Sequence, residues 1–524
     1  MPDHRTYDRR LAGLVNRQAT RSLQGGLKGV EKESLRVTPR GRIARTPHPR
    51  MLGSALTNEH ITTDYSEALI ELVTPPFAQT WELVQYLCDL HQFVYRHLGE
   101  ELLWATSMPC AIEGDESIPI ADYGKSNVGT MKTVYRRGLG HRYGRVMQAI
   151  SGVHFNYSFP EEFWPVLADL LESHDTGQDF RSEAYFSLLR NYRRHGWIVL
   201  YLFGNSPAIC PSFLQGRTVD WLEPLEPGSL YAPHATSLRM SDLGYRNKSQ
   251  AGVSVSVNSL EHYVRDLTRA ISTPEPEYQK IGVKVDGEYR QLNANVLQIE
   301  NEYYSYIRPK RVTLSGERPT KALARGGVQY VEMRSLDVSA FDPVGVNQMK
   351  LRFLEAFAAY CVLAPSPAIE SAEQAELDGN HARVARDGRR AGLVLRRDGR
   401  DVALRDWAGE IVDSMRAVCE LLDEGDAQKH YTAALDVQAA KVRELALTPA
   451  ARSLEEMRTN EESFFEFALR MSKLHKSYFL DLHAPNEARQ AEFRTEANES
   501  LESQARIEAS DTIGFDEYLA RYFA

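Results

Sequence analysis

Residues 27–37 read LKGVEKESLRV, and this stretch sets the expected fold of the chain. Side chains alternate between the two faces of a β-strand. Glu31 and Glu33 therefore point to one side, while Val30 and Lys32 point to the other. The Cα atoms of the two glutamates would lie roughly 6.5 Å apart, a separation that lets two carboxylates share neighbouring cations.

Leu35 and Val37 continue the face of the two glutamates, so the carboxylates border an apolar floor. Two parallel carboxylates repel each other, and burying them is costly unless cations or hydrogen-bond donors compensate. The same pattern also fits a solvated strand face. Further ligands and cations elsewhere in the chain would favour a binding site, and their absence would favour a solvated surface.

The bulk composition is that of a soluble globular protein. The chain has 524 residues, with 43% hydrophobic and 25% charged residues, and is long enough to bury a large core and to divide into more than one domain. The net charge of −9 is modest and spread along the chain, which argues against nucleic acid as a partner.

Targeting and redox signals point to the cytoplasm. The N-terminus has no apolar segment of the secretory kind. The longest apolar run, around 356–364, is far shorter than the roughly 20 residues that span a bilayer. The cysteines have no CxxC spacing, so we expect neither a disulfide framework nor a zinc site. They are Cys88, Cys110, Cys210, Cys361 and Cys419.

The predicted strands carry alternating apolar residues or β-formers. They cover 27–37, 68–73, 150–159, 252–257, 294–300 and 329–338. The strand at 150–159 is the clearest, because one face is apolar and the other, Gly152, His154, Asn156 and Ser158, is polar without any Lys or Glu. Apolar residues at helical spacing predict helices over 7–24, 80–98, 161–173 and 182–198.

The character of the sequence changes near residue 366. The segment 370–405 is charged, and helical periodicity dominates 407–424, 428–445, 452–480 and 486–508. We therefore expect an α+β protein with a catalytic domain over 1–365 and a mainly helical C-terminal region over 366–524.

Familiar nucleotide motifs are absent, but acids gather on the predicted strands. The sequence has no GxxxxGK[ST] and no HExxH, and its glycine-rich run at 138–144 has the wrong spacing for a dinucleotide fingerprint. Oxygen ligands with at most one imidazole suit Mg²⁺ or Mn²⁺. The candidate ligands are Glu31, Glu33, Asp64, Glu71, Glu332 and His154.

Cationic segments accompany these acids, as triphosphate–metal chemistry requires. They contain Lys125, Lys132, Arg136, Arg142, Arg239, Arg308, Lys310, Arg311 and Arg334. Each signal also has a structural interpretation. Asp64 fits a turn, His154 a hydrogen-bonded core position, and Glu332 with Arg334 an ordinary charge arrangement on a strand.

Several long blocks together resemble one family. The blocks are GVEKESLRV, ITTDYSEALIELVTPP, YRRGLGHRYGRVMQAISGVHFNYS, YLFGNSPAIC, TSLRMSDLGYRNKSQ, LQIENEYYSYIRPKR and VQYVEMRSLDV. In this order, from about residue 10 to residue 365, they resemble glutamate–cysteine ligase (γ-glutamylcysteine synthetase) of the proteobacterial type. The resemblance implies antiparallel strands curved into a funnel, similar to the catalytic sheet of glutamine synthetase and the guanido kinases.

The resemblance also implies roles for individual residues. It places metal ions on Glu31, Glu33, Asp64, Glu71, His154 and Glu332. It implies that Arg239 holds a substrate carboxylate and that Arg334 lies near phosphate, both acting in catalysis. It implies that Arg334, Arg136 and Lys132 bind the nucleotide. Tyr135, Tyr245 and Tyr304 match aromatic residues around the acceptor amino acid, and Tyr303 stays open as an alternative to Tyr304.

The expected activity is ATP-dependent ligation of L-glutamate to L-cysteine through a γ-glutamyl phosphate, the first step of glutathione biosynthesis, with two or three Mg²⁺ or Mn²⁺ ions. One alternative is a related γ-glutamyl ligase with another amine acceptor. Another is an inactive relative that acts as a binding protein, which would be expected to lack acids that are all present here. We expect a monomer with small-molecule substrates and no membrane partner.

Overall fold

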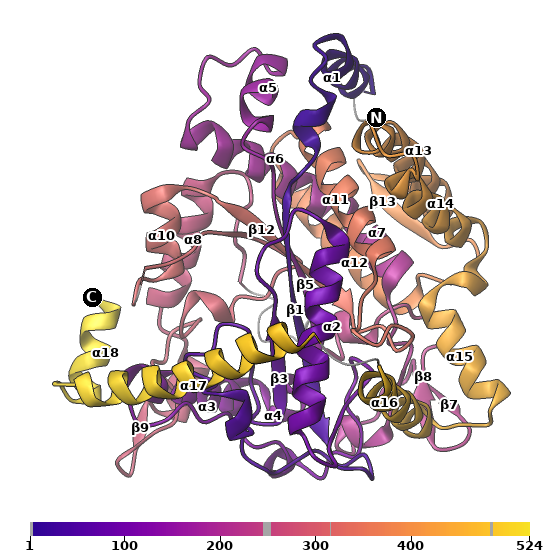
Figure 1. Cartoon of the computed structure of the whole chain (residues 1–524). Helices are drawn as coiled ribbons and strands as arrows, with labels where there is room; N and C mark the ends of the chain where they lie inside the picture. The colour runs from indigo at the N-terminus through magenta and orange to yellow at the C-terminus, as the bar shows by residue number, and fades with distance from the viewer. Residues whose placement is uncertain (1–3, 245–252, 315, 483–485) are drawn as a thin grey trace.

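A seven-stranded antiparallel sheet forms the centre of the molecule (Figure 1). The computed structural model describes residues 4–244, 253–314, 316–482 and 486–524. The strands of this sheet are β1 (Leu27–Val37), β2 (Ile61–Thr63), β3 (Leu69–Val73), β4 (Leu102–Leu103), β5 (Gly152–Ser158), β11 (Ile307–Lys310) and β12 (Tyr330–Asp337). Their order is β11-β12-β5-β1-β3-β2, and β4 pairs with the end of β1. The predicted bounds of β1 are confirmed.

One face of the sheet is covered by helices. Val30, Phe155 and Met333 point into a single core that also holds Leu87 and Phe357 from two of these helices. Period-2 alternation of apolar residues in the strands meets period-3.6 alternation in the helices, so each element buries one face. The helices that contribute to this core include α2 (Thr80–His97), α6 (Gln178–His195), α7 (Trp197–Phe203) and α11 (Gln348–Leu363).

The remaining elements of the first 365 residues border the sheet. The helices are α1 (His4–Asn16), α3 (Asn127–Tyr143), α4 (Arg145–Gln148), α5 (Phe163–Leu170), α8 (Leu260–Ser272), α9 (Pro276–Ile281) and α10 (Pro319–Gly326). Two small antiparallel sheets consist of β6 (Ala208–Ile209), β7 (Glu223–Leu225) and β8 (Ser229–Tyr231), and of β9 (Lys284–Val285) and β10 (Glu288–Tyr289).

The C-terminal region is mainly helical, as predicted. Its elements are α12 (Ser371–Asp387), the hairpin β13 (Val394–Arg397) and β14 (Arg400–Ala403), α13 (Leu404–Leu422), α14 (His430–Arg443), α15 (Pro449–Thr459), α16 (Phe464–Asp481), α17 (Glu487–Ser510) and α18 (Phe515–Phe523). The single helix predicted over 452–480 is two helices, because Ser463 and Glu466 form a capping box that starts α16.

Two predicted strands are wrong within the described residues. Residues 253–257 and 294–300 form no ladder, although Asn295 makes one isolated bridge. Side chains occupy the backbone groups there. The Asp266 carboxylate accepts from the Ser256 N–H, and the Asn293 side-chain oxygen accepts from the Asn295 N–H. Such local bonds compete with ladder pairing.

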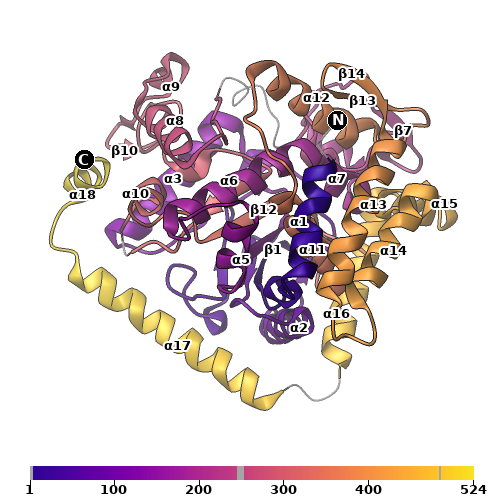
Figure 2. The ribbon, with the colours of Figure 1, turned by 90° about the horizontal axis from the view of Figure 1, so that it is seen from above.

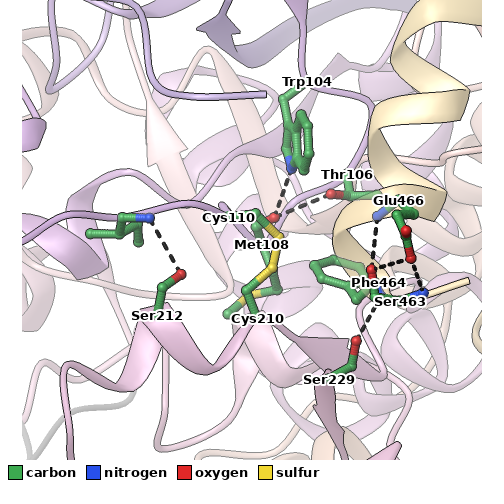
Figure 3. The surroundings of a disulfide bond; sticks show 11 residues. Trp104, Thr106, Met108, Cys110, Cys210, Ser212, Ser229, Ser463, Phe464 and Glu466 are labelled. Carbon is green, nitrogen blue, oxygen red and sulfur yellow. Dashed lines mark hydrogen bonds between the residues drawn. A yellow bond between two sulfur atoms is a disulfide. The ribbon is translucent and has the colours of Figure 1, made fainter. Parts of the chain in front are cut away.

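The structure also corrects the expectation that the cysteines stay unpaired. Cys110 and Cys210 form a disulfide that joins the loop after β4 to the loop after β6 (Figure 3). Both cysteines are buried, and the carbonyl of Met108 beside them accepts bonds from Trp104 and Thr106. The two cysteines are separated by 100 residues, so no short spacing motif announces the pair. No helix of the described residues is long and apolar enough to cross a membrane.

Candidate active site

The face of the sheet opposite the helices carries the acids. Glu31 of β1 is in register with His154 of β5, and Glu33 of β1 is in register with Glu71 of β3. Glu332 of β12 is in register with Asn156 of β5. Side chains at alternate positions of adjacent antiparallel strands meet on one face, so the predicted ligands come together across four neighbouring strands.

His154 lies at the centre of this acidic cluster. Its Nδ1 is 3.1 Å from Glu31 Oε2 and 3.8 Å from Glu332 Oε1, and its Nε2 is 3.6 Å from Glu33 Oε1. Burial, followed by the charge of Arg334, lowers the pKa of His154. The imidazole is therefore held in the neutral form, the form that binds a metal ion.

Two of the acids are crowded by like charges. Burial, followed by the charge of Asp64, raises the pKa of Glu33 to about 8. Burial and the charges of Glu31, Asp64 and Glu33 raise the pKa of Glu71 well above its usual value. Buried carboxylates that repel one another are stabilised by a bound cation.

The donor set fits a hard divalent cation. Glu31, Glu71 and His154 each offer a ligand atom, and these three atoms lie within 4.8 Å of one another. Glu33 also accepts a hydrogen bond from the Gly152 N–H at 2.6 Å, which fixes its carboxylate. Asp64 follows β2 directly and, together with Glu33 and His154, lines a cavity. Carboxylates with one imidazole match the preference of Mg²⁺ and Mn²⁺.

Glu332 stands apart electrostatically, because cations flank it. Lys310 is 3.5 Å from Glu332 Oε1, and Arg334 is 3.1 Å from Glu332 Oε2. Burial opposes ionisation, but the charges of Lys310 and Arg334 hold the pKa of Glu332 well below its usual value. Glu332 is thus ionised and lies between the acidic cluster and the cations.

Arg239 also lines the cavity. Its guanidinium lies 3.8 Å from Asp337, which also accepts bonds from the Asn205 N–H and from the hydroxyls of Ser206 and Ser237. This network holds Arg239 with only 1% of its surface exposed. Both Arg239 and Arg334 line the cavity, as predicted for residues that contact an anionic substrate.

Glycine in the polar face of β5 makes this arrangement possible. A Cβ atom on Gly152 would lie 2.1 Å from Arg239 Nη2, so a side chain there would displace the guanidinium. Arg239 reaches past β5 and donates to the carbonyl of Arg334 at 3.1 Å. The unusual Gly-His-Asn-Ser face of this strand thus has two functions. Gly152 leaves room for the Arg239 guanidinium, and His154 and Asn156 contact Glu31.

Aromatic residues also line the cavity. Tyr135 of α3 and Tyr304 line it, whereas Tyr303 is not among the lining residues, which favours Tyr304 of the two alternatives. Tyr245 lies outside the described residues. The Arg334 guanidinium lies 6.0 Å from the centre of the Tyr304 ring.

The predicted cations of α3 divide between different environments. Arg136 lines the cavity and donates to the Asp64 carbonyl. Lys132 lies over the Tyr123 ring, 5.1 Å from its centre, and does not line the cavity. Arg142 forms a fully buried ion pair with Glu302 at 2.9 Å, so its charge is neutralised within the protein.

Sequence reasoning missed three contributors. Asn156 donates to Glu31 Oε1 at 2.9 Å, and strand alternation with His154 would have indicated this position. Asp337 orients Arg239 across nearly a hundred residues, and Tyr65 lines the cavity beside Asp64. No spacing in the sequence marks either of these two roles.

Comparison with known proteins identifies the family of the chain. Residues 11–384 match the family model described as glutamate-cysteine ligase. The chain is 49% identical over 521 residues to the glutamate–cysteine ligase of Alcanivorax borkumensis, covering 98% of this chain and 99% of that protein. It is also 49% identical over 498 residues to the Pseudomonas putida enzyme of the same name, covering 95% and 94%.

Solved structures give the same result. The crystal structure of glutamate–cysteine ligase from Francisella tularensis in complex with AMP matches with a TM-score of 0.89 and 36% identity, covering 95% of this chain and 98% of that one. A bifunctional glutathione synthetase from Pasteurella multocida shares the fold at a TM-score of 0.72 and 23% identity, covering 93% of this chain and 58% of that one. The chain belongs to the glutamate–cysteine ligase family.

Proposed function

We propose that this chain joins the γ-carboxylate of L-glutamate to the amine of L-cysteine, using ATP and giving γ-glutamylcysteine, ADP and phosphate. This is the first step of glutathione biosynthesis. The observation that carries the proposal is a single cavity in which the carboxylates of Glu33 and Asp64 face the guanidiniums of Arg239 and Arg334. Membership of the glutamate–cysteine ligase family supports it over a ligase with another acceptor.

The reaction needs two bond changes that this cavity suits. A γ-carboxylate oxygen of glutamate attacks the terminal phosphorus of ATP, and the bond to ADP breaks. The cysteine amine then attacks the acyl carbon, the carbon–oxygen bond to phosphate breaks, and the amine loses a proton. Neither step needs a protein nucleophile, so catalysis rests on positioning and charge stabilisation.

The acidic cluster would hold two or three Mg²⁺ or Mn²⁺ ions through Glu31, Glu33, Asp64, Glu71, His154 and Glu332. Bound ions of this kind neutralise charge on phosphate and carboxylate oxygens. Asn156 and the Gly152 N–H fix the directions of two of the carboxylates. Arg334, held by Glu332, is aimed at the transferring phosphoryl group, and Arg239, held by Asp337, binds a substrate carboxylate.

A second cavity beside the first is suited to the nucleoside part of ATP. Its volume is about 330 Å³, and it shares Asn301 and Arg308 with the first cavity. Lys310 and Tyr330 line it, and Lys310 also contacts Glu332 at the edge of the acidic cluster. Binding of AMP by the Francisella tularensis relative supports a nucleotide site in this family. Arg136, the one of the two predicted α3 cations that lines the first cavity, then serves the phosphates from α3.

We further propose that the curved sheet is related to the catalytic sheet of glutamine synthetase and that one chain is sufficient for activity. Sedimentation at the enzyme concentration used for assays, compared with the specific activity across dilution, tests the monomer. Specific activity that falls on dilution contradicts it.

The test of the activity is direct. Purified protein with ATP, Mg²⁺, L-glutamate and L-cysteine is expected to release ADP in equal amount to a γ-linked dipeptide. Alanine, 2-aminobutyrate and ammonia serve as competing acceptors, because a fitted pocket discriminates by about 1–3 kcal/mol per methylene-sized change. ADP release without dipeptide, or equal use of all acceptors, contradicts the assignment.

A further inference from the structure

The last helices of the chain wrap around the outside of the molecule. We call residues 486–524, which contain α17 and α18, the C-terminal strap. In Figure 2 the strap runs along the periphery, and in Figure 1 it crosses in front of α2 and β3 to reach α18. It contacts two segments that lead directly into the active site, although more than 380 residues separate these segments from the strap.

The first segment is the loop that precedes β2 and Asp64. The Ser54 N–H donates to Ser500 Oγ at 2.9 Å, and the Glu59 N–H donates to Glu496 at 3.1 Å. The Thr57 hydroxyl donates to the carbonyl of Ser500. Side-chain and backbone groups of α17 thus satisfy the polar groups of a loop that has no ladder partner of its own.

The second segment is the start of α3. The Asn127 N–H is one of the first amides of this helix and has no partner within it. It donates to the Asp511 carboxylate at 2.5 Å, while the Asn127 side chain donates to the Ile513 carbonyl at 3.0 Å. A carboxylate at a helix N-terminus also interacts favourably with the helix dipole.

The approach of the strap to this helix requires a glycine. Gly124 has a φ of +82°, and a Cβ atom there would lie 2.1 Å from Gln504 Nε2. Next to it, the Lys125 N–H donates to Glu508 at 3.0 Å. A positive φ at residue 124 favours glycine, and a side chain there would collide with side chains of the strap.

An apolar contact completes the junction. Leu519 of α18 is buried with Met131 and Val134 of α3, and Tyr135 packs against the same cluster. Tyr135 and the next residue, Arg136, line the active-site cavity. The segment of α3 that lines the cavity with Tyr135 and Arg136 thus also contacts the strap, through Met131 and Val134.

We propose that the C-terminal strap is a positioning element for the acceptor side of the active site, and that Asp511 is its key residue. The capping bond from Asp511 fixes the start of α3 and thereby the place of Tyr135 and Arg136 in the cavity. This inference rests on the proposed function for the roles of those two side chains. The strap itself contacts no substrate.

The test uses the full-length chain with Asp511→Ala, the conservative variant Asp511→Asn, and Glu502→Ala as a control on the exposed face of α17. Hydrogen exchange at the amides of 127–136 is expected to accelerate about three- to tenfold in Asp511→Ala, the range for a lost helix cap. Asp511→Asn keeps an acceptor oxygen and is expected to restore most of the protection, and Glu502→Ala to leave it unchanged.

The kinetic readout separates positioning from plain stability. Asp511→Ala is expected to raise the KM for L-cysteine about three- to tenfold with kcat changed less than about twofold. A structural role alone would lower the melting temperature and the active fraction without changing KM. Unchanged hydrogen exchange in α3 of Asp511→Ala overturns the proposal for the strap, whether or not the wild-type protein is active. A wild-type protein that makes no dipeptide overturns the proposed function instead, and the exchange measurement still tests the strap. Unchanged KM in an active Asp511→Ala enzyme also overturns it.

Discussion

Glu31 and His154 face each other across the ladder between β1 and β5, with Glu31 Oε2 3.1 Å from His154 Nδ1. Asn156 holds the other oxygen of the same carboxylate at 2.9 Å. The glutamate is thus oriented by two polar side chains of a neighbouring strand, although 19% of its side chain stays exposed. A carboxylate that is both held in place and partly exposed is suited to binding a metal ion.

Replacing Glu31 with Gln tests this role. The amide keeps the shape and one acceptor oxygen but removes a charge from the acidic cluster, so we expect turnover to fall roughly 10²-fold or more with folding retained. The measurement is initial rate against Mg²⁺ concentration, with circular dichroism as a check on folding. Glu420→Gln, an exposed acid of α13, is the matched control. Near-normal turnover of Glu31→Gln at saturating Mg²⁺ would remove Glu31 from the ligand set.

The raised pKa of Glu33, about 8, predicts how the metal-free protein responds to pH. The folded state binds a proton on Glu33 that the unfolded state has lost, so the free energy of unfolding falls as pH rises from about 4.5 to about 8. Glu33→Gln removes the Glu33 contribution to this dependence and leaves that of Glu71, whose pKa is also raised, and in EDTA at pH 8 we expect the melting temperature of the variant to rise by about 2 °C.

Mg²⁺ provides the check on this prediction. The ion stabilises wild-type protein by binding the folded state, and it is expected to stabilise Glu33→Gln less, since one ligand charge is missing. Thermal melts at pH 5 and pH 8, with and without Mg²⁺, give four melting temperatures for each of the two proteins. Equal pH dependence in the two proteins would show that Glu33 does not carry the shift.

Arg239→Lys tests the proposed binding of a substrate carboxylate in the cavity. Lysine keeps the charge but loses the planar fork that can bind a carboxylate with two hydrogen bonds while remaining against Asp337. We expect the KM of an amino-acid substrate to rise about 10- to 100-fold. Arg386→Lys, at a guanidinium that lies over the Trp221 ring, is the matched control. An unchanged KM for both glutamate and cysteine would contradict a role in carboxylate binding.

Local spacing predicted the acidic side of the site, because strand alternation alone places Glu31 with Glu33 and Glu332 with Arg334. It could not predict contacts between distant segments. Arg142 belongs to the same basic stretch as Arg136, yet only Arg136 lines the cavity, since Glu302 neutralises Arg142 from 160 residues away. The contacts of the strap could not be predicted either. The periodicity of α17 predicts a helix but does not indicate which surface of the protein this helix covers.

The disulfide gives a prediction for stability. The bond between Cys110 and Cys210 closes a loop of about 100 residues, and the entropy lost by the unfolded chain corresponds to about 2–5 kcal/mol. We therefore expect Cys110→Ser, or reduction with dithiothreitol, to lower the melting temperature of the protein. Cys88→Ser removes a free thiol and serves as the control. A thiol count on the denatured, unreduced protein checks the pairing: three free thiols are expected, and five would contradict the disulfide.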